Sequence, residues 1–129
     1  MILDASAVLA ILQSEEGAPA LVAALEAADV RRMSGAGVVE AAIVLHARYG
    51  DHGERELDLF LERARVEVVP VTEDQVELAR SGYRRFGRGR HPAGLNYGDG
   101  SSYALARALD EELLFVGEDF DRTHVRVAG

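Results

Sequence analysis

The segment Gly94–Ala106 reads Gly-Leu-Asn-Tyr-Gly-Asp-Gly-Ser-Ser-Tyr-Ala-Leu-Ala, a glycine-rich loop that leads into an apolar helix. Asn96 is a favourable N-cap for that helix, which places Asp99 in the first turn. There a carboxylate faces the positive end of the helix dipole and free backbone N–H groups. Taken alone, Asn96 with an acid three residues later is a common capping arrangement. Whether Asp99 does more than cap depends on where the other acids of the chain fall.

The composition is that of an ordinary globular protein. The chain has 129 residues, of which 48% are hydrophobic and 28% charged, so we expect a single domain over residues 1–129. It contains no cysteine, which excludes disulfides, zinc–thiolate sites and cysteine nucleophiles. All 14 basic side chains are arginines. Without lysine the chain cannot form a P-loop or a Schiff base.

The first residues and the charge limit the location and the partners. The start, Met1 to Asp4, has no basic region of a signal peptide, and no apolar run reaches the length of a membrane span. We therefore expect a cytoplasmic protein with no membrane partner. The net charge of −8 argues mildly against nucleic-acid binding. The basic run Arg84–His91 is the exception, because it contains Arg84, Arg85, Arg88 and Arg90.

Short apolar runs alternate with amphipathic helical patterns along the whole chain. Strands are predicted at residues 2–3, 30–34, 66–71 and 113–116, with Val125 and Val127 as a last edge strand. Helices are predicted at residues 5–12, around 21–28, 38–49, 51–64, from 72, and from 97. This alternation predicts an α/β fold, a three-layer α/β/α sandwich with a mostly parallel central sheet. Ligands of such sheets bind beyond the carboxyl ends of the strands.

Four acids fall near that edge of the predicted sheet. Asp4 follows the first strand, Glu40 lies early in the helix after the second, Asp99 begins a helix, and Asp119 follows the strand at Leu113. Carboxylates crowded together raise each other's pKa unless a cation neutralises them. Oxygen ligands without histidine favour Mg²⁺ or Mn²⁺ over zinc. The four histidines show no metal-ligand spacing, and we interpret them as surface groups.

Glu40 has two interpretations. The apolar face of its helix is predicted to contain Ala36, Val39, Ile43, Val44 and Ala47, and Glu40 lies on that face. A glutamate within an apolar stripe is unusual, because Glu is rarely buried without a partner. The alternative is a glutamate at the edge of the stripe, favoured by the helix dipole. The pattern does not decide between them.

The ordered set of stretches resembles the PIN-domain nucleases, and within them the VapC-type toxins of toxin–antitoxin pairs. The resemblance covers nearly the whole chain. It rests on Ile2–Ala7, on Ser34 and Glu40, on the run Arg88–Asp99, and on Leu113–Phe120.

The resemblance implies a Mg²⁺-dependent endoribonuclease whose acidic quartet is Asp4, Glu40, Asp99 and Asp119. Asp4 and Asp99 would hold the metal directly or through water, and Glu40 and Asp119 would complete or orient its shell. Asp119 competes with Glu118 and Asp121 for the fourth place and is preferred because it stands directly before Phe120. Ser6 and Asn96 match supporting polar positions.

The resemblance also implies partners. These are an RNA substrate, a second copy of the chain in a homodimer, and a VapB-type antitoxin that neutralises the toxin. Apolar residues around 21–25 and 57–61 would line the antitoxin groove, although core packing explains these leucines equally well. Arg84, Arg85, Arg88 and Arg90 would hold phosphates, and Tyr83, Phe86 or Tyr97 would stack on bases; the alternative is a solvated loop with its aromatic rings packed inward.

Three other functions fit parts of the sequence. A phosphatase with an aspartyl nucleophile needs a second Asp two residues after the first, and that position is Ser6. A PIN-like module that only binds a partner would not need all four acids. A DNA-directed PIN nuclease remains compatible with every residue named above.

Overall fold

A computed structural model describes residues 1–87, 97–117 and 126–128 of the chain. In order, the elements are β1 (Ile2–Leu3), α1 (Ala5–Leu12), α2 (Ala18–Ala27), β2 (Arg31–Ser34), α3 (Gly35–Tyr49), α4 (Asp51–Arg63), β3 (Val66–Val69), α5 (Glu73–Phe86), α6 (Tyr97–Leu109) and β4 (Leu113–Leu114). None of the helices in these ranges is long and apolar enough to cross a membrane.

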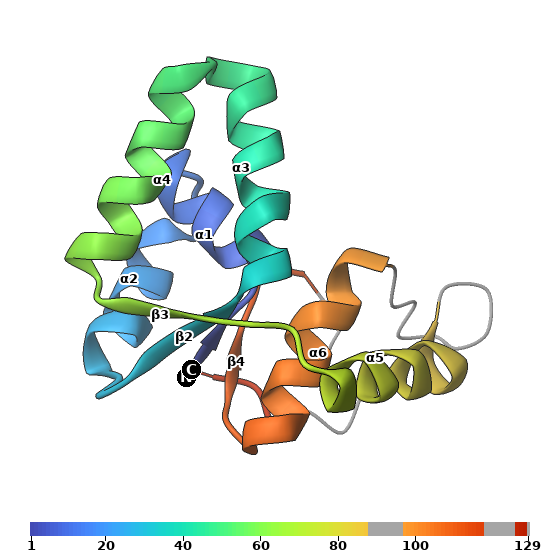
Figure 1. The fold of residues 1–129 in the computed structure, drawn as a ribbon. Helices are drawn as coiled ribbons and strands as arrows, with labels where there is room; N and C mark the ends of the chain where they lie inside the picture. Colours follow the sequence, from blue (N-terminus) through green and yellow to red (C-terminus); the bar gives the residue numbers. More distant parts are fainter. Residues whose placement is uncertain (88–96, 118–125, 129) are drawn as a thin grey trace.

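The four strands form one parallel sheet in the order β3-β2-β1-β4. Val127 adds a single parallel bridge to Leu113 at the edge, while the predicted strand residue Val125 lies outside the described residues. Because all four strands run the same way, their carboxyl ends meet at one edge of the sheet (Figure 1). The predicted parallel α/β sheet is confirmed.

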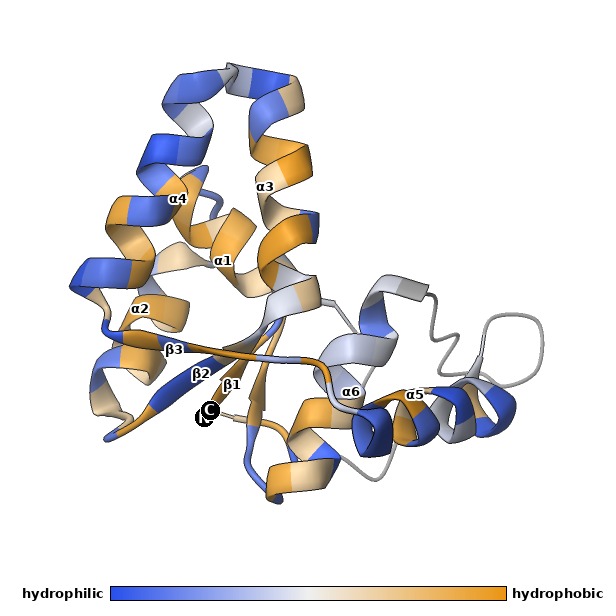
Figure 2. Ribbon diagram, viewed as in Figure 1, coloured by the Kyte–Doolittle hydropathy of each residue, from blue (hydrophilic) through white to orange (hydrophobic). Residues whose placement is uncertain are grey.

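Helices cover both faces of the sheet, which makes three layers (Figure 1). Helices α1–α4 lie on one side, and α5 and α6 lie on the other. Side chains alternate along a strand, so Ile2 packs in the core beneath α5 and α6, whereas Leu3 packs in the core beneath α1–α4. Figure 2 shows that α1 is largely apolar, whereas α4 and α5 alternate apolar and hydrophilic residues.

Helices α5 and α6 pack closely against each other. Phe86 of α5 and Tyr103 of α6 form a tilted ring pair with centroids 6.0 Å apart. Gly82 makes this approach possible, because a β-carbon there would stand 2.5 Å from the ring of Tyr103. The buried Phe86 ring therefore belongs to the core, which excludes it as a base-stacking platform. Tyr83 is about half-exposed.

The strand β2 contains two arginines and was only weakly indicated by its sequence. Arg31 donates from Nε to the Leu25 carbonyl at 2.7 Å and from Nη1 to the Ala64 carbonyl at 2.9 Å. Arg32 pairs with Glu67 and with Glu111. These charge-assisted bonds satisfy both guanidinium groups, so arginine is compatible with a strand in this position.

The predicted apolar face of α3 was wrong. Its buried residues are Gly37, Ala41 and Leu45, whereas Val39 and Ile43 are 58% and 64% exposed. Small residues face inward because α3 lies close to α1 and α4 and also reaches α6. Glu40 consequently stands on the exposed side of α3, beside the start of α6.

Candidate metal and nuclease site

Asp4 stands where β1 passes into α1. Its backbone N–H donates to the Leu114 carbonyl at 3.0 Å, which fixes it beside β4 at the carboxyl edge of the sheet. It also caps α1, because Oδ2 accepts from the Ser6 backbone N–H at 3.1 Å and from Ser6 Oγ at 2.6 Å. The Ser6 hydroxyl in turn accepts from the Val116 N–H at 3.0 Å. Ser6 thus links Asp4 to the residue two positions after β4.

The Val116 bond also explains why β4 is shorter than predicted. The expected strand covered residues 113–116, but the observed one ends at Leu114. The N–H of Val116 bonds to the Ser6 hydroxyl of α1. The chain therefore leaves the sheet at the site and does not extend the strand.

The second oxygen of Asp4 is held from α6. Ser102 Oγ donates to Asp4 Oδ1 at 2.5 Å, across 98 residues of sequence. Ser102 is 1% exposed and Asp4 6% exposed, so this bond is shielded from solvent. Sequence reasoning missed Ser102. A serine on the buried face of an apolar helix, three residues after Asp99, was the available signal.

Asp99 lies in the first turn of α6 and is 8% exposed. Residues three apart share one face of a helix, so Asp99 lies on the face that Ser102 turns toward Asp4. The first-turn position predicted for Asp99 is therefore observed. Its predicted N-cap, Asn96, lies outside the described residues.

Glu40 reaches the same place from α3. A β-carbon on Gly98 would stand 2.6 Å from Glu40 Oε1, so the carboxylate lies against the backbone of α6 one residue before Asp99. The pKa of Glu40 is raised above its ordinary 4.5, mainly by partial burial and further by the negative charge of Asp4. Glu40 thus lies near Asp4 and against the start of α6, the helix whose first turn carries Asp99.

The fourth acid of the predicted quartet and part of the basic run lie in the gaps between the described ranges. Asp119 and its competitors Glu118 and Asp121 lie outside the described residues, as do Arg88 and Arg90. Arg84 and Arg85 are exposed at the end of α5. Arg84 pairs with Glu77 at 3.5 Å, and the Arg85 guanidinium lies 5.7 Å from the centroid of the Phe86 ring.

The donor set of the site fits a hard divalent cation. Its members offer carboxylate and hydroxyl oxygens, which suit Mg²⁺ or Mn²⁺. The oxygens of Asp4, Glu40 and Asp99 do not all lie within 4.8 Å of one another. Mg²⁺ keeps several waters and needs only one or two direct carboxylates, so this wider arrangement is compatible with it.

A tighter group of ligand-type side chains stands elsewhere. His46, Asp51 and Glu54 bring their ligand atoms within 4.8 Å of one another at the junction of α3 and α4. His46 Nδ1 lies 2.8 Å from Glu54 Oε2 and 3.9 Å from Asp51 Oδ1, and the side chains are largely exposed. Contact of the two carboxylates with His46 Nδ1, together with the dipole of α4, accounts for this group.

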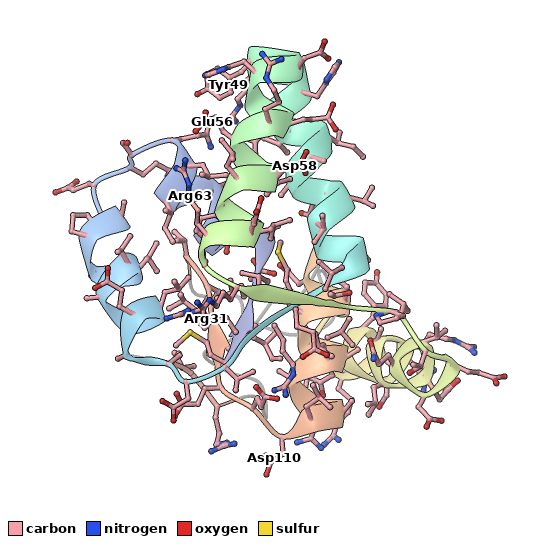
Figure 3. The ribbon with its side chains drawn as sticks, turned by 60° about the vertical axis from the view of Figure 1, so that its left-hand side comes forward. Arg31, Tyr49, Glu56, Asp58, Arg63 and Asp110 are labelled. Atoms are coloured by element: carbon pink, nitrogen blue, oxygen red, sulfur yellow. The ribbon has the colours of Figure 1, made fainter. Side chains whose placement is uncertain are left out.

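A shallow groove of about 390 Å³ runs between α1, α2 and α4. Apolar side chains form much of it, among them Ile11, Leu12, Val22, Leu59 and Phe60. Arg31, Glu56 and Arg63 add charges; Figure 3 labels them around the ends of β2 and along α4. The predicted groove residues therefore have different positions. Leu57 is buried in the core, whereas Leu59 is 39% exposed and lines the groove.

Comparisons with known proteins identify the family of this fold. A model of the PIN domain matches residues 1–125. Ribonuclease VapC30 of Mycobacterium tuberculosis is 50% identical over 125 residues, which cover 97% of this chain and 95% of that protein. Ribonuclease VapC of Mycolicibacterium smegmatis is 52% identical over 125 residues, covering 97% of both chains. The chain therefore belongs to the PIN-domain family and, within it, to the VapC ribonucleases.

Solved structures with low sequence identity share the same fold. VapC20 of Mycobacterium tuberculosis, described as a sarcin-ricin loop cleaving toxin, superposes with a TM-score of 0.79 at 19% identity and covers 99% of this chain and 98% of its own. VapBC2 from Rickettsia felis, bound to a DNA fragment from its promoter, gives a TM-score of 0.77 at 12% identity, covering 98% and 94%. These matches confirm the three-layer α/β architecture.

Proposed function

We propose that this protein is a Mg²⁺- or Mn²⁺-dependent endoribonuclease toxin of a type II toxin–antitoxin pair. The observation that carries the proposal is the Asp4 carboxylate, held by Ser6 and Ser102 at the carboxyl end of β1. Asp99 shares a helix face with Ser102, and Glu40 lies against the residue before Asp99. About 50% identity to proteins named VapC ribonucleases supports the same activity.

The residues of the site have distinct roles. Asp4 and Asp99 would hold the cation directly or through water, and Glu40 and Asp119 would complete or orient its shell. When bound, such an ion would polarise a phosphodiester oxygen and make water a stronger nucleophile at neutral pH. In-line attack would then break the P–O3′ bond and leave a 5′-phosphate.

The substrate is RNA held by arginines. An acidic site repels a polyanion, so binding requires positive charge nearby. Arg84 and Arg85, exposed at the end of α5, begin the basic run that continues to Arg88 and Arg90. Single-stranded loops are the expected target, because their bases are accessible for recognition.

The groove between α1, α2 and α4 is the proposed docking place of a VapB-type antitoxin. Its mixture of apolar side chains with Arg31, Arg63 and Glu56 suits an amphipathic peptide. The groove includes Leu12, at the end of α1, whereas Asp4 caps the start of that helix. Eight helical residues span about 12 Å, so a segment leaving the groove along α1 can reach the acids.

A homodimer is the proposed assembly. The exposed surface of α3 presents Val39 and Ile43, which lose contact with water only if another molecule covers them. A second copy of the chain is the proposed cover. Ile43→Asp should then convert a dimer into a monomer, as measured by light scattering with size-exclusion chromatography, while Arg48→Asp at the far end of α3 should leave the mass unchanged.

One assay separates the proposed activity from its two rivals. Purified protein is incubated with a structured RNA and with DNA of the same sequence, with Mg²⁺ or with EDTA, as wild type and as Asp99→Asn. We expect cleavage of RNA alone, lost with EDTA and with Asp99→Asn. Cleavage of DNA would establish the DNA-directed alternative, and cleavage that survives both EDTA and Asp99→Asn would rule out a metal nuclease. No cleavage of either by wild type would favour the binding module.

A further inference from the structure

Two neighbouring serines of α6 use their hydroxyl groups differently. Ser101 Oγ donates to the Gly98 carbonyl of its own helix, at 3.4 Å. A serine inside a helix often donates in this way to a backbone carbonyl of the preceding turn. Ser102 Oγ instead donates to Asp4 Oδ1 at 2.5 Å, in a part of the molecule from which solvent is almost excluded. The hydroxyl of Ser102 therefore bonds to Asp4 and not to a carbonyl of its own helix.

The bonds to Asp4 leave little freedom for a further ligand. An ionised carboxylate has about four acceptor directions, two on each oxygen. Ser6 occupies both directions of Oδ2, with its backbone N–H at 3.1 Å and its Oγ at 2.6 Å. Ser102 occupies one direction of Oδ1. Among the described contacts, one acceptor direction of the Asp4 carboxylate remains, and it is on Oδ1.

We propose that Ser102 is a positioning residue that fixes the Asp4 carboxylate so that it holds the divalent cation through Oδ1 alone, in one set direction. This inference rests on the proposed function, since it needs Asp4 to be a metal ligand. It goes further by assigning a role to Ser102 and a binding mode to Asp4.

Ser102 holds the Asp4 oxygen that Ser6 does not bond. The two bonds from Ser6 hold Oδ2 against α1, and the Ser6 hydroxyl is itself tied to the Val116 N–H after β4. Ser102 joins the other oxygen to α6, the helix that carries Asp99. One hydroxyl therefore ties the Asp4 carboxylate to the helix that carries the second proposed ligand. Without that hydroxyl, Oδ1 loses the donor that links it to α6, and only the Ser6 bonds to Oδ2 hold the carboxylate.

The test measures cation affinity directly, without RNA. Mn²⁺ is titrated into metal-free protein and its dissociation constant is read by electron paramagnetic resonance, for wild type, Ser102→Ala and the matched control Ser101→Ala. Loss of a group that orients a metal ligand typically weakens binding by about 10- to 100-fold. We expect a loss in this range for Ser102→Ala, and a change below about twofold for Ser101→Ala. In RNA cleavage, Ser102→Ala should lower kcat and leave KM nearly unchanged.

A double-variant cycle shows whether Ser102 acts through Asp4. With Asp4→Asn already present, adding Ser102→Ala should change Mn²⁺ affinity no further. If Ser102→Ala does not fold, as judged by circular dichroism, Ser102→Cys replaces it, because a thiol of similar size is a weaker donor.

The outcomes separate this inference from the proposed function. If wild type binds Mn²⁺ and cleaves RNA while Ser102→Ala, or Ser102→Cys in its place, matches Ser101→Ala, the role of Ser102 is wrong and the proposed function stands. An equal effect of Ser102→Ala with and without Asp4→Asn also overturns that role. If wild type neither binds Mn²⁺ nor requires a cation for cleavage, the proposed function fails, and this inference fails with it.

Discussion

The carboxylate of Glu40 lies against the backbone of Gly98, so closely that a β-carbon on Gly98 would stand 2.6 Å from Glu40 Oε1. The contact joins α3 to the first turn of α6, next to Asp99. A side chain at position 98 would therefore displace the Glu40 carboxylate from this place. Gly100, two residues later, differs, because a β-carbon there would meet Ala79 at 3.6 Å, an ordinary contact distance.

Gly98→Ala should impair cleavage by displacing Glu40. The added methyl group must push the carboxylate away from its place beside Asp99, and misplacement of a reacting group by about 1 Å can cost roughly 100-fold in rate. We expect a fall in kcat of this order in a single-turnover RNA cleavage assay. Gly100→Ala is the matched control and should keep wild-type kcat, with about 0.5–1 kcal/mol of added stability from the better helix former. Equal activity of both variants would contradict this account of Glu40.

Glu40→Gln should stabilise the metal-free protein at neutral pH. Burial and Asp4 raise the pKa of Glu40, so the folded state favours the protonated carboxyl. The stability linked to that proton is fully present below the ordinary pKa of 4.5 and is lost as pH rises through the raised pKa. Tm by differential scanning calorimetry should therefore be higher for Glu40→Gln than for wild type at pH 7.5, with a smaller difference at pH 5. The control Asp58→Asn, an exposed carboxylate on α4, should not show this trend. A lower Tm for Glu40→Gln than for wild type at pH 7.5 would contradict the raised pKa of Glu40.

Charge at the end of α5 should control RNA affinity. Replacing Arg84 and Arg85 with alanine removes two phosphate contacts, so KM should rise. The slope of the logarithm of the binding constant against the logarithm of the salt concentration should become shallower by about two at most. Glu77, which pairs with Arg84 at 3.5 Å, competes with phosphate for that guanidinium. Glu77→Gln should therefore tighten RNA binding, as measured by fluorescence anisotropy at several salt concentrations. Arg55→Ala on α4 is the control, and an equal effect of Arg55→Ala would argue against a specific RNA path.

Leu59→Asp should prevent neutralisation without lowering cleavage. Leu59 lines the groove between α1, α2 and α4, and a carboxylate there disfavours an apolar antitoxin segment. We expect weaker binding of the cognate antitoxin in calorimetry, with normal RNA cleavage by the isolated toxin. Leu109→Asp changes a leucine of similar exposure at the end of α6, outside the groove, and should bind the antitoxin normally. Loss of binding by both variants would show that the groove is not the docking place.

The backbone frame of the site could be predicted because it follows from local patterns. Ile2 and Leu3 followed by Asp4 indicate a strand that passes into a helix, and the β-branched run from Val66 indicates β3. Parallel strands then bring their carboxyl ends to one edge, so the proximity of Asp4 and Asp99 follows from topology. The resemblance supplied the roles of these acids.

What could not be predicted depends on contacts between distant parts of the chain. The hydrogen bond from Ser102 to Asp4 joins residues that are 98 positions apart in the sequence, and no sequence periodicity predicts it. The inward face of α3 is set by its neighbours: Gly37 and Ala41 permit close packing, so the larger Val39 and Ile43 remain outside. The strand β2 was predicted, but the partners of Arg31 and Arg32 that stabilise it were not, because only the folded chain brings them close.

The central claim is that a divalent cation binds between Asp4, Glu40 and Asp99. The most direct measurement is the dissociation constant for Mn²⁺ of metal-free wild type, Asp99→Asn and His46→Ala, determined by electron paramagnetic resonance. The His46 variant removes the other group of ligand-type side chains, at the junction of α3 and α4. The account predicts that Asp99→Asn weakens Mn²⁺ binding by at least about 10-fold while His46→Ala leaves it unchanged. Loss of binding in His46→Ala with wild-type affinity in Asp99→Asn would contradict it.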